Sequence, residues 1–479
     1  MPVKKNFTST FAIKFMLPSF LFNRLWHNPN HIFKLVRSLF IMKIIHTSDW
    51  HLGQNFFTKS RKNEHQAFIH WLLELVKEQQ IDAVIIAGDI FDTGAPPSYA
   101  REMYNQFVVK LSQLGATLIV LGGNHDSVSM LNESKDLLAC LNTYVIANTT
   151  ENVDEQVILL DDRNKQAGAI LCAVPFIRPR DVLQSVAGET STQKKQALGE
   201  AIQRHYQNLH AQALKIQNEQ EQKIHRKLPI IATGHLTALG VTASESVRDI
   251  YIGTLEAFDA NAFPPVDYIA LGHIHRPQIV AKSESIRYCG SPIPLSFDEI
   301  KTKATESDKT GKSHRMLSNK QVVLVEFNES GKRIEPLPIP IFQSMMTLKG
   351  SLESIESQLQ QFTDSEQTVW LCIHVEIDDY LSDLQPRIQS MTEHLNVEVL
   401  QLRRSRSQQA QSLTQVRNET LAELTPKDVF NKRMSLESFE GEEAQARQSR
   451  IMQQFEQVVS DVIEQHNDNN ESDDKEVKE

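Results

Sequence analysis

Cysteine is scarce in this sequence, and the residues that occur are not spaced as disulfide partners or zinc ligands usually are. They are Cys140, Cys172, Cys289 and Cys372. No two form a Cys-x-x-Cys pair, and each lies in or beside an apolar stretch. This pattern predicts buried, reduced thiols in a cytoplasmic protein, because disulfides form mainly in oxidising compartments.

Long apolar runs and an excess of positive charge are also missing. No apolar run approaches the roughly 18 residues that span a bilayer, so we expect no membrane association. The 479 residues carry a net charge of −10, which by itself does not point to nucleic acid. A local basic patch or a bound metal ion can still hold phosphates, so the net charge excludes no phosphate chemistry.

Residues 1–41 contain no acidic side chain. Their six basic residues are Lys4, Lys5, Lys14, Arg24, Lys34 and Arg37. A basic leader of this kind resembles a targeting segment, but basic residues interrupt its apolar stretches and no small-residue cleavage site follows. Because a strand pattern opens directly at Met42, we expect residues 1–41 to be an extension that is unstructured or not translated.

Short apolar runs alternate with amphipathic stretches from Met42 to about Phe297, which is the pattern of a layered α/β domain. Strands are expected at 43–45, 83–87, 117–121, 230–232 and 268–271, and helices at 65–79, 99–114 and 193–222. We assign residues 42–340 to this domain.

The rest of the chain reads as smaller units. Residues 341–408 predict an α+β domain, with strands at 369–377 and 397–402 and helices at 352–362 and 384–395. Residues 409–466 are expected to form helices that dock a partner, with an apolar stripe from Ile451 to Ile463. Residues 467–479 are acidic and are expected to be disordered.

Five segments combine an apolar strand with metal-binding side chains directly after it. They are Ser48-Asp49-Trp50-His51, Gly88-Asp89, Gly123-Asn124-His125-Asp126, Gly234-His235 and Gly272-His273-Ile274-His275. In open α/β sheets the working site lies outside the carboxyl ends of the strands, so we expect these segments to converge.

The residue types suit a site that holds two metal ions. Asp49 and His51 are two residues apart, so in an extended segment both point the same way. Asp89 stands alone at its strand end, which suits a carboxylate that bridges two ions. The set offers oxygen and nitrogen but no thiolate, which favours Mn, Fe or Zn. Two ions can activate water and hold a phosphoester. His125, beside Asn124, is placed to protonate the leaving oxygen.

Each segment alone has an ordinary structural interpretation, because a histidine beside a strand is usually a satisfied core residue and Gly-Asp is usually a turn. Only the conjunction of five argues for chemistry. His65, His70 and His374 lack such context and are expected to be structural or exposed. Asp126 either orients His125 or caps the following turn, and we favour the cap.

The order of these segments resembles that of the calcineurin-like metallophosphoesterases. Further motifs resemble their DNA-repair exonuclease branch and, within it, the SbcD family. These motifs are His46-Thr47-Ser48-Asp49-Trp50-His51-Leu52-Gly53, Gly88-Asp89-Ile90-Phe91-Asp92, Gly290-Ser291-Pro292, Ala95-Pro96-Pro97-Ser98-Tyr99-Ala100-Arg101 and Val247-Arg248-Asp249-Ile250-Tyr251-Ile252-Gly253. The resemblance covers about Met42 to Phe430. It implies an α/β/β/α sandwich with a small α+β capping domain and C-terminal helices.

The resemblance also implies roles for individual residues. One manganese ion would take Asp49, His51, Asp89 and His275, and the other would take Asp89, Asn124, His235 and His273. His125 would be the catalytic histidine. Some relatives carry a second catalytic histidine shortly after Gly-Asp, where this sequence has Asp92, so the role of that position stays open.

Partners and activity follow from the same resemblance. A homodimer of nuclease subunits would join two SbcC ATPase subunits, and the complex would act in DNA replication, recombination and repair. It would be an ATP-dependent double-strand exonuclease and a single-strand endonuclease that cleaves DNA hairpins. The capping domain would help dock DNA. Arg403, Arg404 and Arg406 are either phosphate contacts of that domain or a solvated basic cluster.

Two other functions fit the same pattern less well. A small-molecule phosphodiesterase or phosphatase could use the same metal core without a capping domain. A metal-free scaffold that only recruits the ATPase is disfavoured by the complete ligand set. Measuring the metal content and comparing activity on DNA with activity on small phosphoesters would separate the three.

Overall fold

The structure, a computed structural model, describes residues 41–405 apart from 151, 184–189, 248–256, 301–318, 364 and 377–382, together with Ile451. The predictions for residues 1–40 and 409–479, for Arg406 and for most of the motif at 247–253 lie outside this part. The chain divides into two compact units, Met1–Ser405 and Arg406–Glu479, and all the described residues except Ile451 belong to the first.

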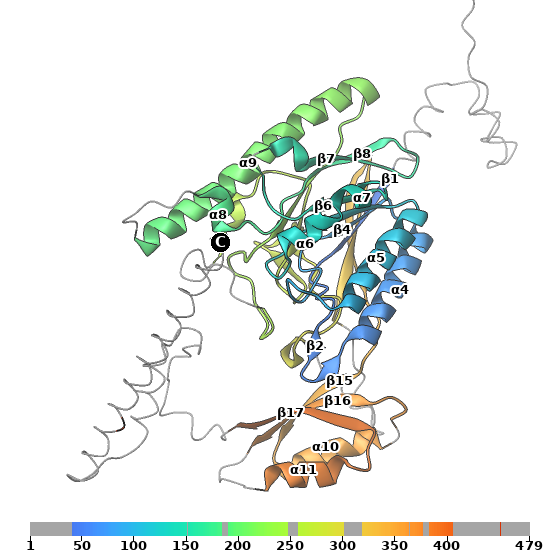
Figure 1. Ribbon diagram of the computed structural model, residues 1–479, viewed down its shortest axis with the longest axis vertical. Coiled ribbons are helices and arrows are strands. Elements are labelled where there is room, and N and C mark those ends of the chain that lie inside the picture. Colours follow the sequence, from blue (N-terminus) through green and yellow to red (C-terminus); the bar gives the residue numbers. More distant parts are fainter. Residues whose placement is uncertain are drawn as a thin grey trace, which may run out of the picture. The chain divides into compact units, whose positions relative to one another are not determined.

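The first four long strands of the main domain and its last two build one six-stranded sheet. Its strands, in spatial order, are β14 (Gly331–Pro338), β13 (Gln321–Asn328), β1 (Ile41–Thr47), β4 (Ala83–Ile86), β5 (Thr117–Leu121) and β6 (Thr143–Ile146). The last four strands are parallel, whereas β13 runs antiparallel to β1. The helices α4 (Lys62–Gln79) and α5 (Ser98–Gln113) cover this sheet (Figure 1).

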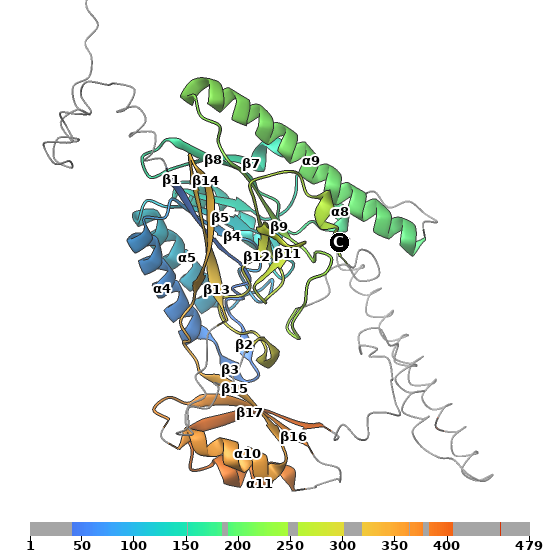
Figure 2. The same ribbon diagram turned by 180° about the vertical axis from the view of Figure 1, so that it is seen from behind.

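A second six-stranded sheet follows. Its order is β11 (Gln278–Val280), β12 (Ser283–Tyr288), β10 (Tyr268–Gly272), β9 (Ile230–His235), β8 (Ala167–Cys172) and β7 (Val157–Asp161). The long helix α9 (Ser191–Ile224) lies along its outer face (Figure 2). Thr190 caps this helix through a capping box with Gln193, which explains why a Gln-rich, polar segment begins a helix at this point.

The two sheets pack against each other through their inner faces. Ile44 and Ile85 of the first sheet share one buried cluster with Leu171 and Ala270 of the second. The order of layers is therefore helix, sheet, sheet, helix, and the predicted α/β/β/α sandwich is confirmed. The five predicted strands and three predicted helices are all present, with boundaries that differ by a few residues.

Residues 345–405 form a three-stranded parallel sheet with two helices on one face. The strands are β15 (Met345–Gly350), β16 (Val369–Glu376) and β17 (Val397–Ser405), and the helices are α10 (Leu352–Leu359) and α11 (Leu384–Thr392). β15 was not predicted, because its sequence MMTLKG has few β-branched residues and ends in glycine. Its pairing with β16 along the whole strand stabilises it instead.

The remaining strands and α-helices of the described part are short. They are β2 (Asn55–Phe56), β3 (Lys59–Ser60), α6 (Val128–Glu133), α7 (Lys135–Ala139) and α8 (Pro179–Val182). The expectation of buried thiols holds for three cysteines and is wrong for Cys140, which is exposed. Cys140 directly follows α7, a surface helix of which only Leu138 is buried.

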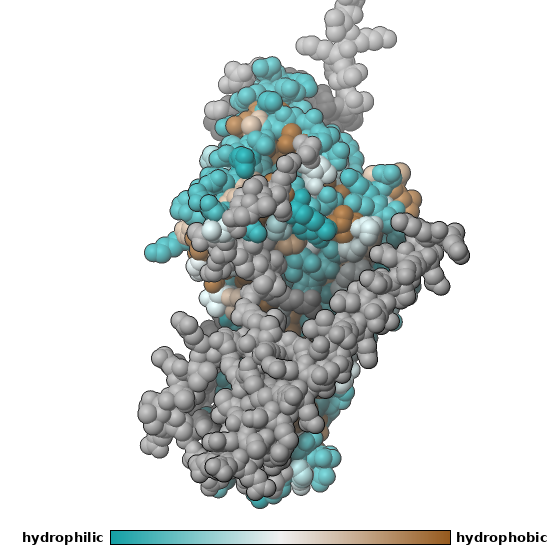
Figure 3. Space-filling view, turned by 60° about the vertical axis from the view of Figure 1, so that its left-hand side comes forward, coloured by the Kyte–Doolittle hydropathy of each residue, from teal (hydrophilic) through white to brown (hydrophobic). Residues whose placement is uncertain are grey.

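The described surface is polar in character. On the face drawn in Figure 3, hydrophobic residues lie in small separate groups among hydrophilic ones. No helix in the described ranges combines the length and the apolar composition that crossing a membrane requires.

Candidate metal centre

The loops after β1 and β4 place their ligands through an unusual backbone. Asp49, His51 and Asp89 all have positive φ angles, of 54°, 47° and 51°. Residues other than glycine rarely adopt this conformation, and strain of this kind clusters at functional sites. Backbone hydrogen bonds join the two loops: Asp49 N donates to Gly88 O at 3.0 Å and His51 N donates to Asp89 O at 3.1 Å.

The predicted ligands meet at the strand ends in overlapping groups. There are three groups: Asp49 with His51 and His275, Asp89 with His235 and His273, and His51 with Asp89 and His125. Within each group the potential ligand atoms lie within 4.8 Å of one another. Asp89 links them, because its Oδ2 lies 3.3 Å from His235 Nε2 and 3.6 Å from His51 Nε2. The seven residues expected to hold metal therefore meet at one place, with Asn124 Oδ1 lying 3.2 Å from His273 Nδ1.

Gly123 leaves the space that Asp89 needs. A Cβ atom on Gly123 would lie 2.1 Å from Asp89 Oδ1 and 2.3 Å from Asp89 N, closer than any side chain can tolerate. The glycine is required by this close approach rather than by its own backbone angles.

We expect Gly123→Ala to displace Asp89 and to weaken metal binding, with a loss of stability of about 1–3 kcal/mol from overpacking. Metal titration and thermal unfolding measure both effects. Gly94→Ala is the matched control, because a Cβ there would meet Ser127 Cβ only at an ordinary 3.6 Å. Equal metal affinity in the two variants would contradict this role of Gly123.

Two of the histidines are oriented so that Nε2 faces the centre. His51 Nδ1 donates to Asp92 Oδ1 at 3.2 Å, and His235 Nδ1 donates to Ala87 O at 2.9 Å. An acceptor at Nδ1 fixes the ring and leaves Nε2 for an ion, as metal-ligating histidines usually require. Asp92, whose role the sequence left open, therefore contacts a candidate ligand directly.

Unsatisfied atoms in the centre indicate that a cation belongs there. His51 Nε2 is buried and has no hydrogen-bond partner among the described residues. His235 Nε2 lies 2.8 Å from Asn124 Oδ1, which is an acceptor. Because Nδ1 of His235 already carries a proton, its Nε2 is a lone pair that faces an oxygen in this arrangement, and a metal ion between the two atoms would satisfy both. The donor set and its burial thus fit divalent metal ions.

The electrostatics point the same way. Burial opposes charge on His235, but Asp89 and Asp49 raise its pKa to about 9. Burial also opposes ionisation of Asp89, whereas the charge of His235 holds the pKa of Asp89 well below its usual value. Burial and the neighbouring His235 lower the pKa of His273 well below its usual value, so His273 stays neutral as a ligand must. The carboxylates create a field that favours positive charge.

His125 lies at the less buried side of the centre. Its backbone N donates to Asp89 Oδ1 at 2.9 Å, and its Nδ1 donates to Asp92 O at 2.7 Å. The ring packs against His51 with 4.7 Å between centroids. Asp92 therefore orients both histidines, one through its carboxylate and the other through its carbonyl.

The expectation that Asp126 caps the following turn is wrong. Ser127 caps α6 by accepting from Met130 N, whereas the Asp126 carboxylate accepts from the backbone N of Ile90, Phe91 and Gly123 at 2.9–3.2 Å. Burial and then the charge of Asp89 raise the pKa of Asp126 to about 6. Asp126 thus ties the loop after β5 to the loop after β4, a contact that no local pattern could reveal.

The three histidines expected to be structural or exposed behave as expected. His65 is buried and its Nε2 donates to Trp50 O at 2.8 Å, and burial lowers its pKa to about 3. His70 is exposed and His374 is half-buried on β16.

Two of the arginines expected to contact DNA, Arg403 and Arg404, lie in the described part and are not brought together. Arg403 and Arg404 are neighbours on β17, so they point to opposite faces of the sheet. Arg403 lies in register with His374, which pairs with Lys349 on the next strand. Its guanidinium makes two hydrogen bonds to the Glu245 carboxylate, of 3.1 and 2.8 Å.

A two-sheet sandwich that gathers such ligands at its strand ends is the architecture of the calcineurin-like phosphoesterases, and residues 42–277 match that family. Residues 341–438 match the family described as the type 5 capsule protein repressor C-terminal domain. The chain is thus a metal-dependent phosphoester hydrolase, and its clustered ligands fit a dimetal site.

Similar proteins of known function show to which family of phosphoester hydrolases the chain belongs. The D subunit of the nuclease SbcCD of Escherichia coli K12 is 50% identical over 428 residues, which cover 89% of this chain and 100% of that one. The proteins of the same name from Rhodobacter capsulatus and Bacillus subtilis are 32% and 28% identical, over 54% and 71% of this chain and 64% and 81% of theirs. The chain belongs to the SbcD family of nuclease subunits, as its motifs predict, and it is a phosphodiester hydrolase.

Proposed function

We propose that this chain hydrolyses DNA as the nuclease subunit of a complex with an SbcC ATPase. The observation that carries the proposal is the position of Asp89, whose carboxylate stands between two groups of histidines at the strand ends. A phosphodiester needs both its attacking and its leaving oxygen stabilised, and paired ions on one bridging carboxylate can do this. The relatives named as the D subunit of the nuclease SbcCD support DNA as the substrate and SbcC as the partner.

Two divalent metal ions are the proposed cofactors, because the donors are carboxylate, amide and imidazole with no thiolate, a set that suits Mn, Fe or Zn. Among these the family resemblance favours Mn. One ion would take Asp49, His51, Asp89 and His275, and the other would take Asp89, Asn124, His235 and His273. When bound, the ions activate a water and neutralise charge on the phosphate.

The side chains around the ions have separate tasks. His125, held by the Asp92 carbonyl, would donate a proton from Nε2 to the leaving oxygen. Asp92 keeps the His51 ring in its ligating orientation through its carboxylate. Asp126 holds the two loops that carry Asp89 and His125 in register. Water is excluded from the deeper ligands, since Asp49, His235 and His273 are all buried.

Residues 341–408 are proposed as the capping domain that helps dock DNA. Lys349, His374 and Arg403 form a row across three strands on one face of its sheet, so they can meet successive phosphates. Arg404, on the other face, and Arg406, outside the described residues, would be separate contacts. The Glu245 carboxylate occupies two of the five N–H donors of Arg403, so a phosphate would bind the remaining donors or displace the carboxylate.

The assembly proposed from the family is a homodimer of this chain with two SbcC subunits in the cytoplasm, trimming double-stranded ends, cutting single strands and opening hairpins in an ATP-dependent manner. The test is hydrolysis of linear duplexes, single strands and DNA hairpins, with and without the ATPase and ATP, in Mn, Mg or Zn. Cleavage of small phosphodiesters without cleavage of any DNA would overturn the proposal in favour of a small-molecule phosphodiesterase.

We expect truncation after Ser407 to separate catalysis from partner binding. The first compact unit ends at Ser405, so both metals and unassisted cleavage of DNA should survive the truncation. Co-purification with the ATPase and stimulation by ATP should be lost, because the apolar stripe between Ile451 and Ile463 suits a partner helix. Unchanged affinity for the ATPase in the truncated chain would contradict this docking role.

A further inference from the structure

The motif Gly290-Ser291-Pro292 packs directly against the main chain of a candidate ligand. Gly290 has a φ of +79°, and a Cβ there would lie 2.7 Å from His275 O. Ser291 N donates to the same carbonyl at 3.2 Å. This motif, which has no role in the catalytic scheme above, therefore contacts the backbone carbonyl of His275.

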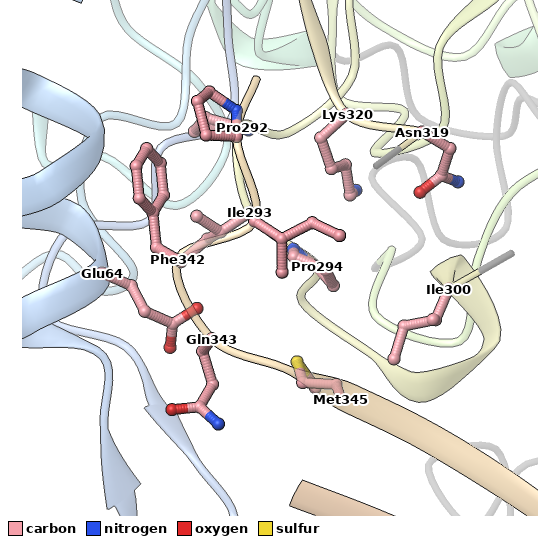
Figure 4. Close-up of a pocket in the computed structure, with 12 residues that line it drawn as sticks. Glu64, Pro292, Ile293, Pro294, Ile300, Asn319, Lys320, Phe342, Gln343 and Met345 are labelled. Carbon is pink, nitrogen blue, oxygen red and sulfur yellow. The ribbon is translucent and has the colours of Figure 1, made fainter. Parts of the chain in front are cut away.

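Lys320, at the start of β13, reaches the same place from the other sheet. Its ammonium donates to His275 O at 2.9 Å, to Ser291 Oγ at 2.7 Å and to the carboxylate of Glu299. Figure 4 shows Lys320, Pro292 and Pro294 among the residues that line one pocket. Three elements distant in sequence thus meet at one backbone carbonyl.

Glu299 completes the arrangement and is almost entirely buried, with 0% of its side chain exposed. Its Oε2 pairs with Lys320, and its Oε1 accepts from Ser244 Oγ at 2.9 Å and from Ser246 Oγ. Ser246 Oγ in turn lies 2.6 Å from His275 Nδ1, and Glu299 Oε1 lies 3.5 Å from that nitrogen. Because the Ser246 hydroxyl donates to Glu299, it must accept its other hydrogen bond from His275 Nδ1.

The consequence is a defined orientation and tautomer for His275. The proton sits on Nδ1, pointing to Ser246 and Glu299, and Nε2 is left for an ion. This is the same arrangement that Asp92 provides for His51 and Ala87 O for His235, but here two serines, a carboxylate and a buried lysine build it. Burying the charges of Glu299 and Lys320 costs desolvation free energy that their attraction only about offsets, so the pair adds little net stability. This indicates that the pair has a role other than stabilising the fold.

We propose that Glu299 is a positioning residue of the metal centre, acting through Ser246 on the ring of His275 while Lys320 fixes the backbone of His275. The inference rests on the proposed ligand role of His275. It predicts that the network matters to one ion of the pair, the one that His275 binds, and not to the ion held by Asn124, His235 and His273. Partners of this kind typically change metal affinity by about 10–100-fold.

The test is Mn titration of the full chain, with metal content after dialysis and the melting temperature of the metal-free protein measured alongside. Glu299→Gln and Ser246→Ala are expected to keep one tight ion per chain and to bind the second about 10–100-fold more weakly. Ser246→Ala leaves the Glu299–Lys320 pair intact, so it decides the question if Glu299→Gln fails to fold. Glu64→Gln is the matched control, because Glu64 is a buried glutamate that pairs with Arg61 and should leave both affinities unchanged.

His275→Ala separates failure of this inference from failure of the ligand assignment. If His275→Ala loses one ion while Ser246→Ala and Glu299→Gln bind both normally, the positioning role is overturned and the ligand assignment stands. If His275→Ala still binds two ions with unchanged affinity, the assignment and the inference both fall. Equal loss of both ions in Ser246→Ala would also overturn the proposal, because a general structural defect predicts that result.

Discussion

Replacing Asp89 with asparagine is expected to weaken the binding of both metal ions by more than about 100-fold, beyond what an indirect partner of a ligand contributes. Asp89 is the residue that the two ligand groups share, with Oδ2 between His51 Nε2 and His235 Nε2. Asparagine keeps the size of the side chain and can still accept from His125 N, so the loss reports the charge and the bridge. Elemental analysis and Mn titration measure the effect.

Asp82 offers a matched control at the opposite end of the same strand. It is also buried, and its carboxylate accepts from Lys43 N and Arg163 N rather than facing the centre. Asp82→Asn should lower stability and leave both ions in place. Two tightly bound ions in Asp89→Asn would show that Asp89 is not the bridge.

His125→Ala is expected to retain both ions and to lose about 10²–10⁴ of the rate of DNA hydrolysis, the usual contribution of a positioned proton donor. The ring is half-buried at the open side of the centre, and its Nδ1 donates to Asp92 O. Single-turnover cleavage with saturating Mn isolates the chemical step from metal binding.

His70→Ala is the control for removing a histidine, since His70 is exposed on α4 and belongs to none of the candidate ligand groups. Its cleavage rate should be normal. The cluster of His125 with His51 and Asp89 offers a second possibility, in which His125 binds metal. Loss of an ion in His125→Ala would support that possibility against the proton-donor role, and near-normal turnover of the metal-loaded variant would reject both.

The local sequence was sufficient to locate the candidate ligands. Each one comes directly after a short apolar run, and parallel strands bring the residues beyond their carboxyl ends to the same edge of a sheet. Asp89 and Asn124, which follow the parallel neighbours β4 and β5, could therefore be placed together without knowledge of any contact between them. Their meeting with His235 depends on the packing of the two sheets, because β9 belongs to the second sheet. The same reasoning located most helices, because the amphipathic period is a property of neighbouring residues.

The local sequence pattern could not predict which residues orient the ligands. Asp126 was expected to serve its own turn, but its carboxylate accepts from the loop after β4. Arg403 and Arg404 are adjacent in the sequence, but the pleat of β17 puts them on opposite faces of the sheet. β15 has a weak strand pattern and exists through its partner.

The sequence alone determined which side chains stand at the ends of the strands and which chemistry their donor atoms can support. Only the tertiary structure decided which hydrogen bonds hold those side chains in place: Asp92 for His51, and Glu299 and Ser246 for His275. The physical reason is range. Periodicity and strand ends depend on residues a few positions apart, whereas a buried hydrogen bond depends on which distant loops meet when the two sheets pack.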